Sequence, residues 1–280
     1  MFPVLFRIGG FTVTSFGVMI ALSFVAGGWI MAKELKRKGQ DPEHAWDLAG
    51  WAAIFGILGA KLYYLILNWQ LTAANPRGMI LSRSGLVWYG GLILAALVIL
   101  WRLHRLKLPI ATFADAAGPT LALGYAVGRL GCFLVGDDYG GPTDLPWGIA
   151  FPEGAPPSTA GNLREFGVSV PADVPDATVM TVHPTQLYET GMSLAIFFIL
   201  WKLRHRFTVP GTIWFTWMAL AGVERFIVEI FRAKDDRFVA GLTVAQIISL
   251  LITAVGIAGY VAVTRRAATQ HPPKAAPARA

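Results

Sequence analysis

The sequence predicts an all-α polytopic membrane protein of about seven transmembrane helices with a small irregular extracytoplasmic cap. Composition points there first, because 55% of the 280 residues are hydrophobic and only 15% are charged, whereas a soluble protein carries about a quarter charged residues. Patterning points there as well, since apolar segments approaching or exceeding the roughly 20 residues of a membrane-spanning helix recur along the chain.

Seven segments are expected to be helices that cross the membrane. They are residues 11–32, 48–69, 85–101, 116–136, 184–203, 209–231 and 242–263. The first and the last carry no charge over 22 residues each, whereas the third and the fifth are shorter or more polar.

Basic residues in the loops predict the orientation of these helices. They cluster after alternate segments, at Lys33, Lys36, Arg37 and Lys38, at Arg102, Arg105 and Lys107, at Lys202, Arg204 and Arg206, and at Arg265 and Arg266. Basic loops stay in the cytoplasm, so the N-terminus is expected outside and the C-terminus inside. Arg232, Lys234 and Arg237 are an exception to the alternation. Because the net charge of +7 resides in such clusters, we expect no nucleic-acid partner.

One bundle domain is expected over residues 1–266. Residues 137–182 form its cap, a stretch rich in Pro and Gly that predicts tight turns and at most a hairpin. Residues 267–280 are rich in Ala and Pro and are expected to be a disordered cytoplasmic tail.

Neither a metal nor a cofactor is expected. The single Cys132 excludes an internal disulfide and any site with several cysteines. The five histidines lack the i, i+4 spacing of zinc ligands on a helix.

Two arginines lie inside apolar segments, Arg129 in the fourth and Arg225 in the sixth. A guanidinium in hydrocarbon costs at least ~2.5 kcal/mol, so each must have a partner. Guanidinium grips phosphate or carboxylate with two parallel hydrogen bonds. Two interpretations therefore remain: the arginines bind a phospholipid headgroup, or they form structural ion pairs with Glu229 and Glu189. We expect the nearby acids to be too few to neutralise every buried cation, which favours the headgroup.

Polar residues gather in the outer halves of five segments. Besides the arginines they include Lys61, Tyr63 and Tyr64, Trp88 and Tyr89, His183, Gln186 and Tyr188, Glu189, and Glu224 and Glu229. This asymmetry predicts one polar cavity beneath the outer surface. Snorkelling of Lys61 and an aromatic belt of Tyr63, Tyr64 and Trp88 remain alternatives.

Five motifs, in this order, resemble the bacterial prolipoprotein diacylglyceryl transferase family. They are Gly-Arg-Leu-Gly-Cys-Phe at 128–133, Asp-Asp-Tyr-Gly at 137–140, Asp-Leu-Pro-Trp-Gly at 144–148, His-Pro-Thr-Gln-Leu-Tyr-Glu at 183–189, and Glu-Arg-Phe-Ile-Val-Glu-Ile-Phe-Arg at 224–232. The resemblance spans roughly residues 10–264.

The resemblance implies an enzyme of the inner membrane that moves the diacylglyceryl group of phosphatidylglycerol to the lipobox cysteine of a prolipoprotein signal peptide. A thioether forms and glycerol phosphate leaves. The implied catalytic residues are Arg225, Arg129, Glu189 and Tyr89. The implied phosphatidylglycerol-binding residues are Arg129, Gly131, Cys132, Gly136, Gly90, Tyr188 and His183.

Three positions depart from the family pattern. Tyr89 stands where the family has His, Phe16 where it has Tyr, and Cys132 where it has Asn. A phenol titrates near pH 10, so tyrosine is a poor base at neutral pH. Base candidates for the thiol are Glu189, Asp137, Asp138 and Glu229. A catalytically silent or altered-specificity lipid-binding paralogue stays open as an alternative.

Overall fold

The computed structural model describes residues 1–9, 11–82, 85–234 and 237–270. Its long helices are α1 (Ser15–Arg37), α2 (Glu43–Leu67), α5 (Trp88–Arg105), α6 (Ile110–Val135), α8 (Thr185–Leu203), α9 (Thr212–Glu229) and α10 (Val244–Gln270). Its short helices are α3 (Trp69–Ala74), α4 (Pro76–Leu81) and α7 (Ala160–Glu165). Its strands pair in antiparallel twos: β1 (Val4–Ile8) with β2 (Phe11–Thr14), β3 (Ile149–Ala150) with β4 (Thr181–Val182), and β5 (Arg237–Val239) with β6 (Leu242–Thr243).

The all-α membrane class is confirmed. Each predicted segment coincides with a long helix, and four of these helices, α1, α2, α6 and α10, are long and apolar enough to cross a membrane. That α5, α8 and α9 also cross stays a prediction. The bounds of every segment differ by one to several residues from those of its helix. At three segment ends another element forms instead: Phe11–Thr14 form strand β2, Trp69 begins the separate helix α3, and Leu242–Thr243 form strand β6. Helix α10 continues to Gln270, and residues 271–280 lie outside the described part.

The chain divides into two compact units, Gly27–Phe113 and the remainder, Met1–Ala26 with Ala114–Ala280. In the unit Gly27–Phe113, helices α2 and α5 pack through glycines. A Cβ on Gly91 would lie 2.7 Å from Gly56 O, and one on Gly59 would lie 2.6 Å from Leu94 Cβ. Small residues at these positions let the two backbones approach closely, as at membrane helix interfaces.

Polar contacts also join segments of this unit. Arg102 on α5 pairs with Asp47 on α2 at 3.0 Å. Lys61 on α2 donates to Ser82 Oγ at 2.8 Å and to Ser82 O at 2.9 Å. Lys61 therefore has hydrogen-bond partners within the protein.

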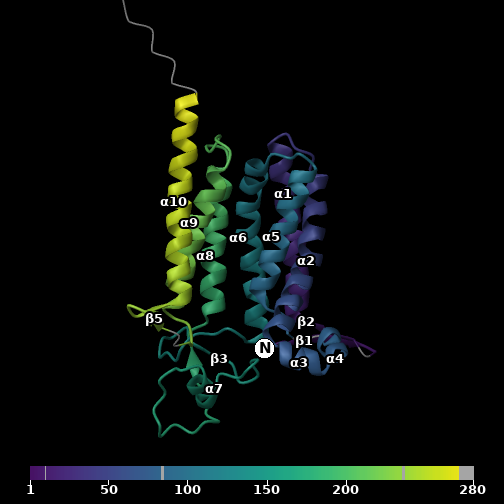
Figure 1. Ribbon diagram of the computed structural model, residues 1–280. Helices are drawn as coiled ribbons and strands as arrows, with labels where there is room; N and C mark the ends of the chain where they lie inside the picture. The colour runs from purple at the N-terminus through teal and green to yellow at the C-terminus, as the bar shows by residue number, and fades with distance from the viewer. Residues whose placement is uncertain (10, 83–84, 235–236, 271–280) are drawn as a thin grey trace, which may run out of the picture. The chain divides into compact units, whose positions relative to one another are not determined.

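In the other unit, helices α8, α9 and α10 run beside one another (Figure 1). Helices α9 and α10 meet at small residues, since a Cβ on Gly256 would lie 2.8 Å from Phe215 O. Asp115, a fully buried residue of α6, holds the start of α9. Asp115 accepts hydrogen bonds from the backbone N–H groups of Gly211 and Trp214, each at 3.0 Å. This carboxylate therefore caps a helix from another element, as an N-cap side chain does within one.

The cap has a small core of its own, formed by Tyr139, Phe151, Leu163, Val182 and Ala233. The Tyr139 ring stacks on Phe151 with centroids 5.4 Å apart. Its hydroxyl donates to Pro157 O at 2.8 Å. The two-residue strands β3 and β4 and the six-residue helix α7 are the regular elements that the structure describes between residues 137 and 182. This core fixes the chain that leaves α6.

Candidate active site

Two of the first three residues of the loop after α6 have a left-handed backbone, Gly136 with φ +74° and Asp138 with φ +57°. A Cβ on Gly136 would lie 3.0 Å from Gly154 Cα, so glycine is required there by space as well as by conformation. The first turn of α8 holds the loop: Thr185 Oγ1 donates to Asp138 O at 2.7 Å, and Gln186 Nε2 donates to Asp137 O. The Asp138 side chain is thus presented from a fixed backbone.

Six side chains of alternating charge form a closed ring of ion pairs, which we term the arginine ring. In order around it they are Arg129, Glu189, Arg225, Glu229, Arg232 and Asp138, with Asp138 pairing back to Arg129. They come from α6, the loop after it, α8, α9 and the turn after α9.

Glu189 forms the buried side of the arginine ring. It ion pairs through Oε2 with Arg129 Nη2, and its Oε1 lies 3.9 Å from Arg225 Nη1. Tyr125 Oη on α6 donates to Glu189 Oε1 at 2.7 Å. One carboxylate thereby links both intramembrane arginines predicted from the sequence.

Asp138 and Glu229 close the ring through Arg232. Asp138 Oδ2 accepts from Arg129 Nη1 at 2.9 Å, and Asp138 Oδ1 accepts from Arg232 Nη2 at 2.9 Å. Glu229 Oε2 lies 2.5 Å from Arg225 Nη2 and 3.9 Å from Arg232 Nε. The three arginines and three carboxylates balance in charge.

Burial differs sharply around the ring. The side chains of Glu189, Glu229 and Arg129 are 1%, 2% and 9% exposed. Those of Arg225 and Asp138 are 35% and 46% exposed. Among the described residues, Asp138 and Arg225 are therefore the ring members most accessible to a ligand.

For the ionisable groups outside the helices, burial and neighbouring charges determine the pKa. Burial raises the pKa of Asp138, but the charges of Arg232 and Arg129 outweigh it and lower that pKa to about 2. Burial disfavours the charge of Arg232, yet the Asp138 and Glu189 carboxylates raise its pKa above the ordinary value. Burial and the neighbouring Asp138 raise the pKa of Asp137. At neutral pH Asp138 is therefore ionised.

The balance of charge corrects one expectation from the sequence. The sequence predicts too few acids for the buried cations, yet each ring arginine has two carboxylate partners. Glu224, another acid of α9, is buried beside the ring residues and accepts from Ser193 Oγ at 2.6 Å. A phosphate would therefore bind here because of the geometry and exposure of the ring, not because of unpaired charge.

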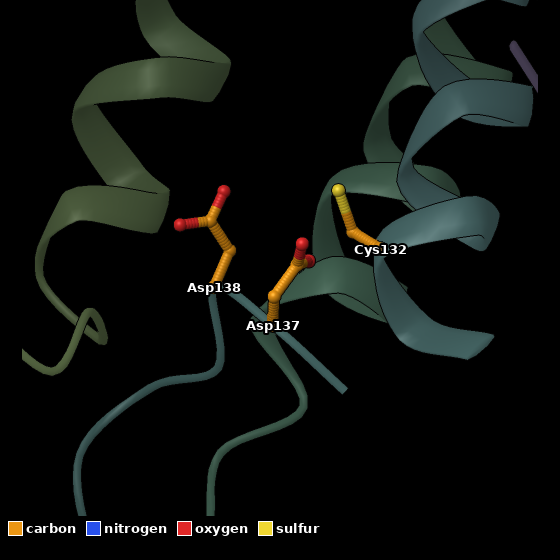
Figure 2. Close-up of side chains that lie close together, drawn as sticks. All are labelled: Cys132, Asp137 and Asp138. Carbon is orange, nitrogen blue, oxygen red and sulfur yellow. The ribbon is translucent and has the colours of Figure 1, made fainter. Parts of the chain in front are cut away.

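Cys132, Asp137 and Asp138 lie close together, with one ligand atom of each within 4.8 Å of the others. Figure 2 shows Cys132 on its helix and the two aspartates on the loop that follows. A cation would meet Arg129 here, because Arg129 Nη1 donates to Cys132 Sγ at 3.4 Å as well as to Asp138. Such a guanidinium disfavours a metal ion by like-charge repulsion.

His183 and Tyr188, both predicted at the site, belong to an aromatic cluster and not to the arginine ring. Tyr188 Oη accepts from Trp147 Nε1 at 2.8 Å and lies 3.2 Å from His183 Nδ1. The Phe231 ring lies 5.2 Å from the His183 ring, centroid to centroid. These residues line an open apolar groove of about 520 Å³. Burial lowers the pKa of His183, so its ring is neutral at pH 7.

The glycines predicted at the site and Tyr89 are not members of the arginine ring. A Cβ on Gly131 would lie 2.9 Å from Met19 Cβ on α1, so Gly131 has a helix-packing role. Gly136 directly follows the last residue of α6. Tyr89 and Gly90 open α5 in the unit Gly27–Phe113; Gly90 is buried against α2, and Tyr89 is 54% exposed. Contact of any of these with lipid stays a prediction.

From the sequence we do not predict that Arg232 belongs to the arginine ring or that Tyr125 binds Glu189. Arg232 is in the sequence analysis a basic loop residue and the last residue of the motif at 224–232, without a role of its own, and it lies in the turn after α9. Tyr125 lies one helical turn before Arg129, which was a usable signal. Asp138 was considered as a base or a turn residue, and its role between two arginines had no sequence signal.

Comparison with known proteins shows which family this chain belongs to. The family model for prolipoprotein diacylglyceryl transferase matches residues 3–262. The chain belongs to the prolipoprotein diacylglyceryl transferase family. A relative from Clostridium tetani, named phosphatidylglycerol–prolipoprotein diacylglyceryl transferase, is 32% identical over 92% of this chain and 96% of its own length. A relative of the same name from Gloeobacter violaceus is 31% identical over 97% of this chain and 96% of its own.

Other relatives with that name share the same span, such as one from Finegoldia magna at 31% identity over 91% of this chain and 92% of its own. The family match includes all six residues of the arginine ring and the aromatic cluster. Membership in the transferase family therefore covers both units of this chain.

Proposed function

We propose that this protein transfers the diacylglyceryl group of phosphatidylglycerol to the lipobox cysteine thiol of prolipoproteins. Family membership across residues 3–262 supports the reaction. The single structural observation that supports it best is the arginine ring, which is open to an anionic ligand on the side of its most exposed carboxylate, Asp138.

The reaction needs two things from the protein. The acceptor thiol loses its proton, and the thiolate attacks the glycerol carbon that bears the phosphate ester. A C–S bond forms, the C–O bond breaks, and its electron pair leaves on glycerol phosphate. The site must therefore hold a phosphate and stabilise the charge that grows on it, and fixed guanidinium groups in a water-poor setting do both.

The roles follow from position in the ring. Arg129 and Arg225 bind the phosphate, and Arg225 also faces the reacting thiol. Glu189 positions both arginines, since its carboxylate lies between them. Asp137 is the best-placed base, because its Oδ1 is buried without a hydrogen-bond partner and its raised pKa favours uptake of a proton. Tyr89 supplies at most a hydrogen bond.

Residues 1–266 act as one transmembrane catalytic domain in the bacterial inner membrane. The N-terminus and residues 137–182 lie outside, and the C-terminus lies in the cytoplasm. Gly131, Cys132, Gly136, Gly90, Tyr188 and His183 contribute to phosphatidylglycerol binding. Basic loops after alternate helices support the orientation.

The test is transfer by the detergent-purified chain from phosphatidylglycerol to a synthetic lipobox peptide. We expect a thioether-linked diacylglyceryl peptide and released glycerol phosphate, and rescue of a bacterium depleted of its own transferase. Tyr89 and Cys132 in place of the family residues favour one rival, a silent or altered-specificity lipid-binding paralogue. Lipid binding without any thioether product would establish that rival and refute the transferase.

A further inference from the structure

Asp138 occupies the position in the arginine ring that best resembles a bound phosphate. Its two oxygens each accept a guanidinium N–H at 2.9 Å, one from Arg129 and one from Arg232. Two guanidinium groups that converge on a pair of oxygens suit the two non-bridging oxygens of a phosphodiester equally well.

Asp138 is also the ring carboxylate that a ligand can replace. It is 46% exposed, whereas Glu189 and Glu229 are 1% and 2% exposed. Glu189 and Glu229 belong to helices α8 and α9, but Asp138 belongs to a loop. Displacing either glutamate would leave a carboxylate that is almost fully buried without its arginine partners, while Asp138 can turn into water and remain solvated.

The loop allows this exchange by side-chain rotation alone. The Asp138 carbonyl is held by Thr185 Oγ1 at 2.7 Å, so the backbone need not move. Its φ of +57° is a conformation that few non-glycine residues adopt, and the two arginine contacts help to hold it there. Rotation of the carboxylate would free Arg129 Nη1 and Arg232 Nη2 together.

We infer that Arg232 and Arg129 form a phosphate clamp that Asp138 fills in the lipid-free protein and that the phosphatidylglycerol headgroup takes over when it binds. Asp138 is therefore an internal competitor of the lipid. The inference rests on the proposed function for the identity of the ligand, and it adds Arg232 and Asp138 to the residues that determine lipid affinity.

Charge supports the exchange. The ring is neutral with Asp138 in place, and a phosphodiester carries one negative charge, so the exchange keeps the ring neutral. A zwitterionic lipid would bring its cationic headgroup towards three arginines, which disfavours it. The clamp accordingly selects an anionic phospholipid.

The experiment measures binding of short-chain phosphatidylglycerol to the purified full-length chain by calorimetry. Asp138→Asn keeps the shape but removes the competing charge, and we expect the Kd to fall about threefold or more. Arg232→Gln should raise the Kd roughly tenfold or more, and should do so in the Asp138→Asn background as well. Asp176→Asn removes the partner of Arg164 in the cap, an ion pair that shares no residue with the ring, and should leave the Kd unchanged.

A purely structural ion pair predicts the opposite for Asp138. Weaker or unchanged phosphatidylglycerol binding by Asp138→Asn, measured at a temperature at which both the variant and the parent are folded, overturns the inference. Arg232→Lys serves if Arg232→Gln fails to fold: it keeps the charge without the fork, and binding at parental strength would likewise overturn it.

Two further probes identify the ligand. Short-chain phosphatidylcholine should bind more weakly than phosphatidylglycerol, and inorganic phosphate should compete only weakly. Inorganic phosphate that binds as tightly as phosphatidylglycerol would overturn the assignment to a lipid headgroup. Failure of the proposed function looks different: the variants shift lipid affinity as expected, but no thioether forms on the lipobox peptide.

Discussion

Arg129 and Arg225 pair with opposite oxygens of the same carboxylate, that of Glu189. The two arginines are on α6 and α9, and Glu189 is on α8, so one buried acid joins three helices. Two guanidinium groups would repel each other at this separation without an anion between them. Glu189 is thus the residue on which the geometry of the site depends.

Glu189→Gln should destabilise the protein severely. The amide leaves two cations without their shared buried anion, and breaking a buried ion pair by removing one partner costs about 3 kcal/mol or more. Thermal unfolding of the detergent-purified variant measures the effect. Asp176→Asn, which removes an exposed pair, is the control and should cost less than ~1 kcal/mol. Equal unfolding temperatures for the two variants would refute this role of Glu189.

Asp138 gives a defined dependence on pH. Its pKa in the folded protein is about 2, below the ~3.9 of an aspartate in an unfolded chain. A depressed pKa stabilises the fold above the unfolded value, and this stabilisation is lost as the pH falls towards the folded value. The difference in unfolding temperature between the parent and Asp138→Asn should stay constant from about pH 5 to 8 and shrink below about pH 4. A difference that already fades between pH 7 and pH 5 contradicts the assigned ion pairs.

Asp115 should matter for stability and not for lipid affinity. Asp115→Ala removes the acceptor for the N–H groups of Gly211 and Trp214 at the start of α9. Loss of such a cap costs about 1 to 2 kcal/mol. We expect a lower unfolding temperature, partly restored in Asp115→Asn, which keeps one acceptor oxygen. A changed Kd for phosphatidylglycerol, with the unfolding temperature unaltered, would show that Asp115 belongs to the binding site instead.

Tyr89 should be dispensable as a base. Tyr89→Phe keeps the ring and removes the hydroxyl, so transfer to the lipobox peptide should fall but remain measurable. Tyr89→His should be tolerated, and a rise in the transfer rate is the expected direction because imidazole titrates near neutral pH. Complete loss of transfer in a folded, membrane-inserted Tyr89→Phe variant would make the phenol essential and would contradict this account.

The sequence predicts the helices well, because membrane helices must satisfy their backbone hydrogen bonds internally and so form long apolar runs. Residues 242–263, uncharged throughout, lie almost wholly within α10. Boundaries were less predictable. Phe11–Thr14 belong to the uncharged run of the first predicted segment, but they pair with β1 as a strand, and this pairing is not specified by the local sequence.

The site was predicted in part. Arg129, Glu189 and Arg225 stand out because charge in an apolar segment is costly. Arg232 and Asp138 do not, since both follow helices, where charged residues are ordinary. Their contact joins residues 94 positions apart, and no local pattern specifies such a pairing. His183 and Tyr188 share the motif of Glu189 but lie elsewhere. Tyr188, one residue before Glu189 on α8, points to another side of the helix, towards Trp147, and His183 precedes the helix and lies against Phe231.

The central claim is that the arginines hold a phosphate through the two-pronged geometry of guanidinium. The most direct measurement is phosphatidylglycerol binding and thiol transfer by purified Arg129→Lys, Arg129→Ala and Arg225→Ala variants of matched thermal stability. Lysine keeps the charge but loses the fork, so Arg129→Lys should be impaired almost as severely as Arg129→Ala. Arg129→Ala and Arg225→Ala variants that bind lipid and turn over like the parent would contradict the account.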